Sequence, residues 1–287
     1  MNLSRNIEEE MRKAIDYFAI SLNCKIINSL THSTLIISGW NDNMESRKAI
    51  AHYLVGLRAS AIDAALNIKS QLEDTPEDLI ELYGNVMAII GKKNDDLSID
   101  QKQDERNPWI CEGICHLGMT IALQRQEIHP MGEIVAIDYP HIASKDHGLD
   151  VLVLYKKDAT FGLSIIETKA YKLNPAKAIN NATKFFKEIE EGKHDLRLRQ
   201  SVHIMRTSLA KEVQQSISGS FWKRERTYIA NPHYDSTITM EYSNNHPIFL
   251  RLFNDKEKVV LMPNAIVDFD LFFDQIADEM RNFVESL

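Results

Sequence analysis

Apolar residues recur at helical spacing through most of the first hundred positions. Residues 45–73 keep this spacing without a proline. A second predicted helix starts with Pro76 at its first position and ends at Gly91. The pattern predicts a mostly helical N-terminal region over residues 1–105. The polar, acid-rich stretch 92–107 fits either a linker or a surface loop.

After residue 105 the apolar spacing alternates between the period of helices and that of strands. Two apolar runs around a polar turn predict a β-hairpin at 146–170. Helices are predicted at 108–126, 174–192 and 269–287, strands at 132–139, 224–231 and 246–253, and either type at 199–209. This succession predicts an α/β fold, with a core at 106–220 and a C-terminal part at 221–287 that packs on it.

Three charged residues lie at the open end of the predicted hairpin. If the turn centres on Asp158 and Ala159, Asp150 and Glu167 face each other, with Cβ atoms about 4.5–5.5 Å apart. Lys169 then projects from the same face as Glu167. Like charges in direct opposition destabilise a hairpin beside an apolar core, so a compensating cation is expected.

A divalent cation between the two carboxylates would compensate their charge, and oxygen ligands suit Mg²⁺ or Mn²⁺. Lys169 could then orient or deprotonate an attacking water, or stabilise the negative charge of a transition state. The same charges also fit a solvent-exposed hairpin end, in which Lys169 pairs with Glu167. The acid-x-Lys triplet alone is weak, because it recurs at 100–102 and 191–193, but only 167–169 closes an apolar strand.

The segments "GLD" and "IIETKA", joined by a strand, a turn and a second strand, resemble the PD-(D/E)XK nuclease superfamily. The resemblance spans roughly residues 109–205 and implies a restriction-endonuclease-like core, a mixed central sheet flanked by helices. It implies that Asp150 and Glu167 bind the catalytic metal and that Lys169 supports the attacking water. Glu112, on the preceding predicted helix, matches a further acid that the family often has there.

One departure from the family pattern is that Gly148 and Leu149, and no proline, precede Asp150. Within the superfamily, the layout is similar to the nuclease subunit of Hachiman-type anti-phage defence systems. That narrower resemblance implies a helicase or ATPase partner. The competing interpretation is a non-catalytic nucleic-acid-binding or regulatory subunit with a nuclease-like fold.

Charge is unevenly distributed along the chain. The net charge is −8, but residues 169–226 carry 13 Lys and Arg against 6 Asp and Glu. A local basic region on an acidic protein can attract a polyanion, although such lysines also suit an ordinary solvated helix face. We therefore predict a nucleic-acid partner, with DNA favoured. The predicted contacts are Lys172, Lys177 and Lys184 after the motif, and Lys223, Arg224 and Arg226 among aromatic residues.

Other signals bound the class of protein. No window has the ~18 uninterrupted apolar residues that span a bilayer, and the N-terminus is polar and acidic, unlike a signal peptide. Three cysteines favour a reducing, cytoplasmic environment, and Cys111 and Cys115 are interpreted as buried thiols on a helix rather than zinc ligands. His141 and His147 precede Asp150 closely enough to reach its site. Walker A, G-x-S-x-G and dinucleotide motifs are absent.

Overall fold

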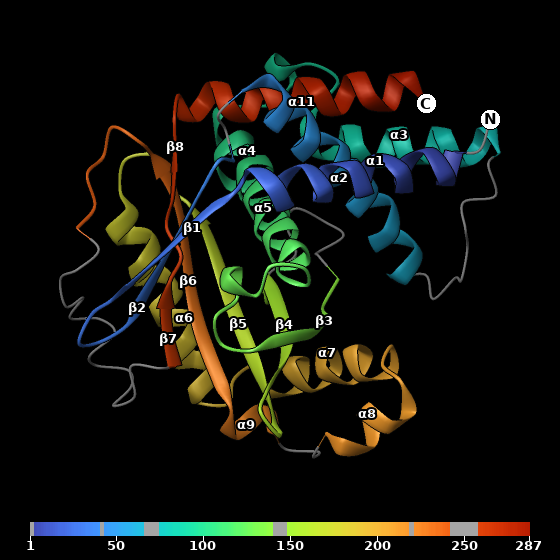
Figure 1. Cartoon of the computed structure of the whole chain (residues 1–287). Coiled ribbons are helices and arrows are strands. Elements are labelled where there is room, and N and C mark those ends of the chain that lie inside the picture. The colour runs from blue at the N-terminus through green and yellow to red at the C-terminus, as the bar shows by residue number, and fades with distance from the viewer. Residues whose placement is uncertain (1–2, 41–42, 66–74, 140–147, 218–220, 242–257) are drawn as a thin grey trace.

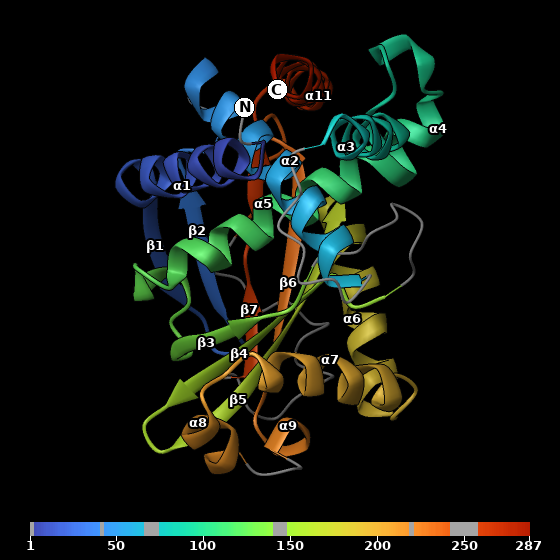
Figure 2. The ribbon, with the colours of Figure 1, turned by 90° about the vertical axis from the view of Figure 1, so that its right-hand side faces the viewer.

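The computed structural model describes residues 3–40, 43–65, 75–139, 148–217, 221–241 and 258–287. It has the predicted α/β architecture, a mixed sheet with helices packed on both faces (Figure 1). In the two perpendicular views, helices α1, α2, α3 and α11 gather at one end of the molecule and α7, α8 and α9 at the other (Figure 2). None of the described helices is long and apolar enough to span a membrane.

The central sheet combines two antiparallel parts with a parallel middle. Its strand order is β1-β2-β7-β6-β5-β4-β3, and β8 pairs with β6 beside this path. The pairs β1–β2, β3–β4 and β4–β5 are antiparallel, whereas the pairs β2–β7, β7–β6 and β6–β5 are parallel. The strands are β1 (Asn23–Asn28), β2 (Ser33–Ser38), β3 (Glu133–Ile137), β4 (Val151–Lys157), β5 (Thr160–Ala170), β6 (Arg226–Asp235), β7 (Val259–Leu261) and β8 (Asn264–Ile266).

Two hydrophobic cores lie on opposite faces of the sheet. The larger packs under α1, α2, α3, α5 and α11, and the smaller packs under α6, α7 and α9. The helices are α1 (Leu3–Ser21), α2 (Met44–Ala65), α3 (Pro76–Ile90), α4 (Ile99–Gln101), α5 (Asn107–Ala122), α6 (Pro175–Glu190), α7 (Asp195–Thr207), α8 (Lys211–Ser216), α9 (Phe221–Arg224) and α11 (Phe269–Ser286). Short 3-10 turns occupy Asn94–Asp96 and Gln126–Ile128, and a π-helical turn occupies Lys102–Arg106.

Local capping signals predicted the bounds of α3 correctly. The Thr75 side chain accepts a hydrogen bond from the backbone N–H of Asp78, whose carboxylate accepts one from the Thr75 backbone N–H in return. Pro76 occupies the first helical position, where its missing N–H has no helical partner to lose. Gly91 ends the helix with a φ of 72°, a value that favours glycine.

The N-terminal region is less purely helical than predicted, because strands β1 and β2 lie within it. Strand β2 pairs with β7 and thereby joins the central sheet. The stretch 92–107 is not an extended linker. It forms short helical turns, and Arg106 is 1% exposed, with its Nη1 2.6 Å from Oδ1 of Asp274 on α11.

The segments 199–209 and 246–253 were predicted as a strand or helix and as a strand, respectively. Residues 199–207 belong to helix α7, which resolves the choice between strand and helix. The strand predicted at 246–253 lies outside the described residues. The division of the chain into regions at residues 105 and 220 stays a prediction.

Candidate active site

The hairpin of β4 and β5 has the predicted register. Val151 pairs with Ile166, and the turn contains Asp158 with a φ of 53°. Asp and Asn occupy this left-handed region more readily than most residues, so the turn chemistry suits a tight reversal. Asp150 immediately precedes the paired residues of β4 and therefore lies beside Glu167, as the sequence predicted.

Both hairpin strands are buried on both faces, which explains their nearly continuous apolar sequence. Alternate side chains enter opposite cores. The core under α6 receives Leu152, Leu154, Leu163 and Ile165, and the core under α5 receives Val151, Val153 and Ile166. Asp150 is two residues from Leu152, and Glu167 is two residues from Ile165. Both therefore lie on the face of the sheet that α6 covers.

A compact ion-pair cluster joins the three predicted catalytic residues. The Nζ of Lys169 lies 2.6 Å from Oε1 of Glu167 and 3.6 Å from Oδ2 of Asp150. Nζ also donates a hydrogen bond to the Thr168 carbonyl at 3.1 Å, and the Thr168 N–H donates to Oδ2 of Asp150 at 2.6 Å. The ammonium therefore lies among three oxygens, which is the environment that a bound cation requires.

The cluster is buried, in contrast to the interpretation of a solvated hairpin end. Asp150 is 7% and Glu167 5% exposed, and the Lys169 side chain is 30% exposed. Pairing of Lys169 with Glu167 was nevertheless part of that simpler interpretation, and the structure shows it. Lys169 thus supplies one positive charge against the two opposed carboxylates.

Burial and mutual repulsion dominate the electrostatics of the cluster. Burial raises the pKa of Glu167 well above its usual range, and the charge of Asp150 raises it further, while Lys169 opposes both effects. For Lys169, burial lowers the pKa, but the two carboxylates outweigh burial and raise the pKa above its ordinary value. Lys169 consequently remains a cation, and Glu167 holds its proton to higher pH than an exposed glutamate.

The three residues open into a cleft of about 1050 Å³. Its walls come from the π-helical turn and the start of α5, the end of β5, both the first and the later turns of α6, and the start of α11. Glu112 lines the same cleft from α5 and contributes to the raised pKa of both Glu167 and Lys169. The structure therefore brings Glu112 near the predicted site.

The donor set fits a metal ion in part. Within the described part of the chain, no three His, Cys, Asp or Glu side chains are arranged to hold a metal ion. Asp150 and Glu167 are thus a two-carboxylate site, and Glu112 does not complete a third ligand position. Oε2 of Glu167 is buried without a hydrogen-bond partner among the described residues, so one oxygen can accept a cation. Mg²⁺ commonly binds through one or two carboxylates and takes its other ligands from water and phosphate.

The predicted basic contacts divide between the cleft and other surfaces. Lys172 and Lys177 line the cleft. Lys184 is exposed on α6, outside the residues that line it. Lys172 also forms an ion pair at 2.5 Å with Asp270 of α11. Of the lysines predicted just past the motif, two are therefore beside the site.

The second basic group lies at the opposite end of the sheet. Leu163 of β5 pairs with Arg226 of β6, whereas Lys169 pairs with Pro232. Six residues of strand separate these pairs by roughly 20 Å. Lys223 and Arg224, which precede Arg226, are exposed at that distant end.

Arg226 itself is only 8% exposed. Its guanidinium lies 3.2 Å from Oε1 of Glu190 and 3.8 Å from Oδ1 of Asp195, and it donates to the Trp222 carbonyl at 2.6 Å. These contacts tie β6 to α6, α7 and α9. Arg226 therefore has a structural role, and its predicted contact with nucleic acid lacks support.

A buried polar network behind the cluster was missed by the sequence analysis. Oδ1 of Asn231 on β6 accepts hydrogen bonds from Thr168 Oγ1 at 3.3 Å and from the His233 ring at 2.8 Å. Asn264 Nδ2 lies 3.3 Å from the other ring nitrogen of His233. The only sequence signal was the spacing of Asn231 and His233 by two, which is weak because β6 also contains Arg226, Thr227 and Asp235. Through Thr168, this network contacts the backbone that holds Asp150.

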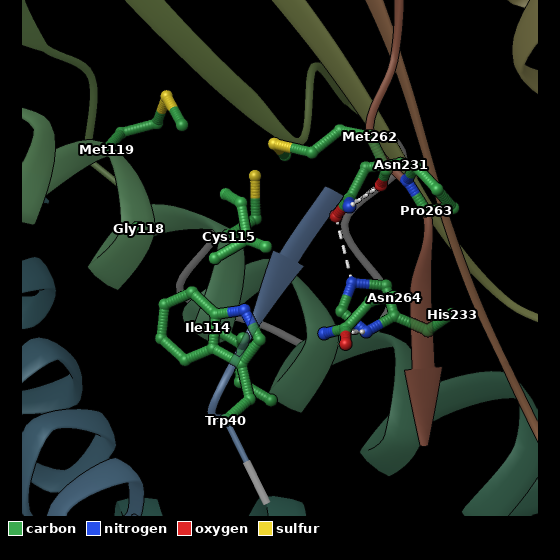
Figure 3. A pocket seen from close by; sticks show the side chains of 11 residues that line it. Trp40, Ile114, Cys115, Gly118, Met119, Asn231, His233, Met262, Pro263 and Asn264 are labelled. Atoms are coloured by element: carbon green, nitrogen blue, oxygen red, sulfur yellow. Dashed lines mark hydrogen bonds between the residues drawn. The ribbon is translucent and has the colours of Figure 1, made fainter. Parts of the chain in front are cut away.

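The network borders a small internal pocket of about 20 Å³, which is room for about one water molecule (Figure 3). Trp40 and Met262 contribute apolar surface to it, and Asn231, His233 and Asn264 contribute polar groups. Cys115 lies at the same pocket. Its position supports buried packing rather than metal chemistry.

The cysteine prediction is confirmed for both thiols on α5. Cys111 and Cys115 are buried, and burial raises the pKa of each thiol. His141 and His147, which the sequence placed within reach of Asp150, lie outside the described residues.

Comparisons with known proteins do not assign the chain to a family. No protein-family model matches the sequence, and no curated protein or solved structure gives a match.

Proposed function

We propose that the protein is a metal-dependent nuclease with a restriction-endonuclease-like core, which hydrolyses phosphodiester bonds. The observation that carries the proposal is the pair of buried carboxylates, Asp150 and Glu167, with Lys169 between them in an open cleft. Burying two like charges is unfavourable without a compensating cation. Both carboxylates line a cleft, and the pKa of Glu167 is raised there, a combination that is typical of catalytic sites and supports the proposal.

Asp150 and Glu167 would hold Mg²⁺ or Mn²⁺, because both are oxygen donors and Oε2 of Glu167 has no partner among the described residues. When bound, the metal would supply positive charge against the negative charge that develops on the phosphate. Glu112 lies where its carboxylate can interact with this site through the cleft. The backbone N–H of Thr168 keeps Asp150 oriented toward the cleft.

Lys169 would orient the attacking water and stabilise negative charge in the transition state. Its Nζ already lies within reach of both carboxylates and of a backbone carbonyl, so little reorganisation is needed to place the cation. Lys172 and Lys177, which line the cleft, would contact substrate phosphates. DNA is the favoured substrate, and the resemblance to Hachiman-type nucleases extends the proposal to anti-phage defence with a helicase or ATPase partner.

The test is cleavage of DNA and RNA substrates by the pure protein in Mg²⁺ or Mn²⁺. Cleavage should disappear in EDTA and in Lys169→Ala. Lys156→Ala is the matched control, because Lys156 is an exposed lysine on the other strand of the same hairpin. Cleavage that survives Lys169→Ala would overturn the site assignment.

Absence of cleavage by the wild-type protein would direct attention to its partner. The same assay would then be repeated with a co-purifying ATPase. Nucleic-acid binding without cleavage in that complex would favour the competing class, a non-catalytic subunit with a nuclease-like fold.

A further inference from the structure

Beyond the carboxylates, the cleft has an aromatic side chain that is held rigidly beside Lys169. Tyr171 follows the end of β5 and lines the cleft. Its backbone N–H donates to the His233 carbonyl at 2.9 Å, and its hydroxyl accepts a hydrogen bond from Nδ2 of Asn181 at 2.8 Å. Both ends of the residue are therefore fixed while its ring borders the cavity.

The ring of Tyr171 is covered by a cation. Nζ of Lys177, in the first turn of α6, lies 5.0 Å from the centre of the ring. Of the three lysines that line the cleft within the described residues, Lys169 and Lys172 form ion pairs with carboxylates. Lys177 is the one among them without such a pair. An aromatic face and an available ammonium are the two groups that contact a nucleotide's base and its phosphate.

The rest of the cleft is acidic. Its described lining includes seven Asp and Glu residues against three Lys. Asp104 and Glu105, from the π-helical turn, contribute to this acidic lining, as does Asp270 at the start of α11. A polyanion therefore meets favourable charge only along the part of the cleft formed by the end of β5 and the start of α6, and unfavourable charge elsewhere.

We propose that Tyr171 and Lys177 form a nucleotide-binding site for single-stranded nucleic acid, next to the scissile phosphate. This inference rests on the proposed nuclease function and specifies its substrate class. An unpaired base stacks against the Tyr171 ring in the place that the Lys177 ammonium now occupies. Lys177 moves from the ring to the adjacent phosphate.

The charge distribution favours one strand over two. A duplex carries one negative charge per 1.7 Å of its axis, whereas each strand carries one per 3.4 Å. The second strand of a duplex would bring its phosphates toward the acidic part of the cleft. In addition, the bases of a duplex are stacked on one another, so none is available to Tyr171 unless it leaves the helix.

The experiment measures binding apart from cleavage. Fluorescence anisotropy of labelled single strands and of the matched duplex is recorded with the full chain, in EDTA and in Ca²⁺. We expect tighter binding of the single strand. Tyr171→Ala should weaken single-strand binding by about 5- to 150-fold, the effect of losing one base–aromatic stack, and should change duplex binding less.

Two further variants separate stacking from folding. Tyr171→Phe keeps the ring and should keep most of the affinity, whereas Tyr171→Leu keeps apolar volume and should lose it. Lys177→Ala should weaken binding and reduce its salt dependence, whereas Lys187→Ala, an exposed lysine further along α6 and outside the cleft lining, should not. Thermal melts confirm that each variant is folded.

Equal or tighter binding of the duplex would overturn the inference. Folded Tyr171→Ala and Tyr171→Leu variants that bind single strands as tightly as the wild type would also overturn it. So would a wild-type protein that does not bind single strands. These results are distinct from those that would reject the proposed nuclease function. The nuclease proposal is rejected if the protein shows no cleavage that requires both a metal ion and Lys169. Tyr171-dependent binding of single strands without such cleavage would retain the nucleotide site and reject the nuclease.

Discussion

The ammonium of Lys169 lies 2.6 Å from the carboxylate of Glu167, two residues away on the same strand. Residues two apart on a strand share a face, so the spacing alone brings the pair together. The ammonium contacts Oε1, while Oε2 of the same carboxylate is buried without a hydrogen-bond partner among the described residues. Lys169 therefore stabilises a carboxylate that is only half satisfied, and a cation bound at Oε2 would complete it.

Replacing Lys169 should show how much the stability of the fold depends on its ion pair with Glu167. In metal-free buffer, we expect Lys169→Met to lower the free energy of unfolding by about 1.5–3 kcal/mol, because hydrogen bonds to charged groups contribute about that much. Mn²⁺ should restore more stability to this variant than to the wild type, since the two carboxylates then have no other cation. Urea unfolding in EDTA and in Mn²⁺ measures both effects. Lys156→Met is the control, and equal stability of Lys169→Met and wild type in EDTA would contradict the prediction.

Replacing Glu167 by a neutral side chain should keep or raise the stability of the protein in metal-free buffer. Burial, followed by repulsion from Asp150, raises the pKa of Glu167, so ionisation of this group destabilises the folded state as pH rises through that pKa. Glu167→Gln removes the ionisation. In EDTA the variant should melt at or above the wild-type temperature, and its advantage should grow with pH. Mg²⁺ should then stabilise the wild type but not the variant. A variant that melts well below wild type at every pH would reject this account.

The hairpin could be predicted in detail because its determinants are local. The alternation of apolar residues, the turn at Asp158 and the spacing of Asp150, Glu167 and Lys169 are all contained in one short segment. The same holds for α3, whose caps at Thr75 and Gly91 lie next to the helix they bound. Patterns of this kind can be interpreted without knowledge of the rest of the fold.

Features that depend on distant partners could not be predicted in this way. Arg226 resembled a surface residue because its neighbours are polar and aromatic, but its carboxylate partners, Glu190 and Asp195, lie on helices more than thirty residues earlier. Strand β1 is also difficult to recognise, because much of it is exposed at the edge of the sheet. Its apolar alternation is correspondingly weak, and its identity as a strand depends on pairing with β2.

The contact between the 92–107 segment and α11 should contribute strongly to stability. Asp274 binds the buried guanidinium of Arg106 at 2.6 Å and lies 3.3 Å from Nζ of Lys102. Asp274→Ala leaves a buried cation without its carboxylate, which should lower the free energy of unfolding by about 3 kcal/mol. Asp270→Ala, on the same helix, removes an exposed ion pair with Lys172 and should cost at most about 1 kcal/mol.

Urea unfolding of the two variants measures the difference. Similar losses of unfolding free energy in Asp274→Ala and Asp270→Ala would show that the buried contact contributes no more to stability than the exposed ion pair. In that case the segment would behave as a surface loop, one of the two interpretations that its sequence allowed.

Two histidines, the buried His233 and the half-buried His116, should make the protein less stable in mild acid. Burial lowers the pKa of His233 to about 3 and that of His116 to about 4, from an ordinary value of 6.5. Between its lowered pKa and the ordinary value of 6.5, each histidine is protonated in the unfolded chain but not in the folded protein. The free energy of unfolding therefore falls as pH falls below 6.5. Each histidine should contribute a slope of about 1.4 kcal/mol per pH unit in its window.

A variant of His233 separates this effect from general acid denaturation. His233→Gln should flatten the dependence of unfolding free energy on pH between about pH 6 and pH 4, although it should also lower stability near neutral pH by disturbing the bond to Asn231. His203→Gln, at an exposed position on α7, is the control substitution. Urea unfolding at several pH values gives both slopes. If the His233 variant keeps the full wild-type slope, protonation of other groups must account for the loss of stability in acid.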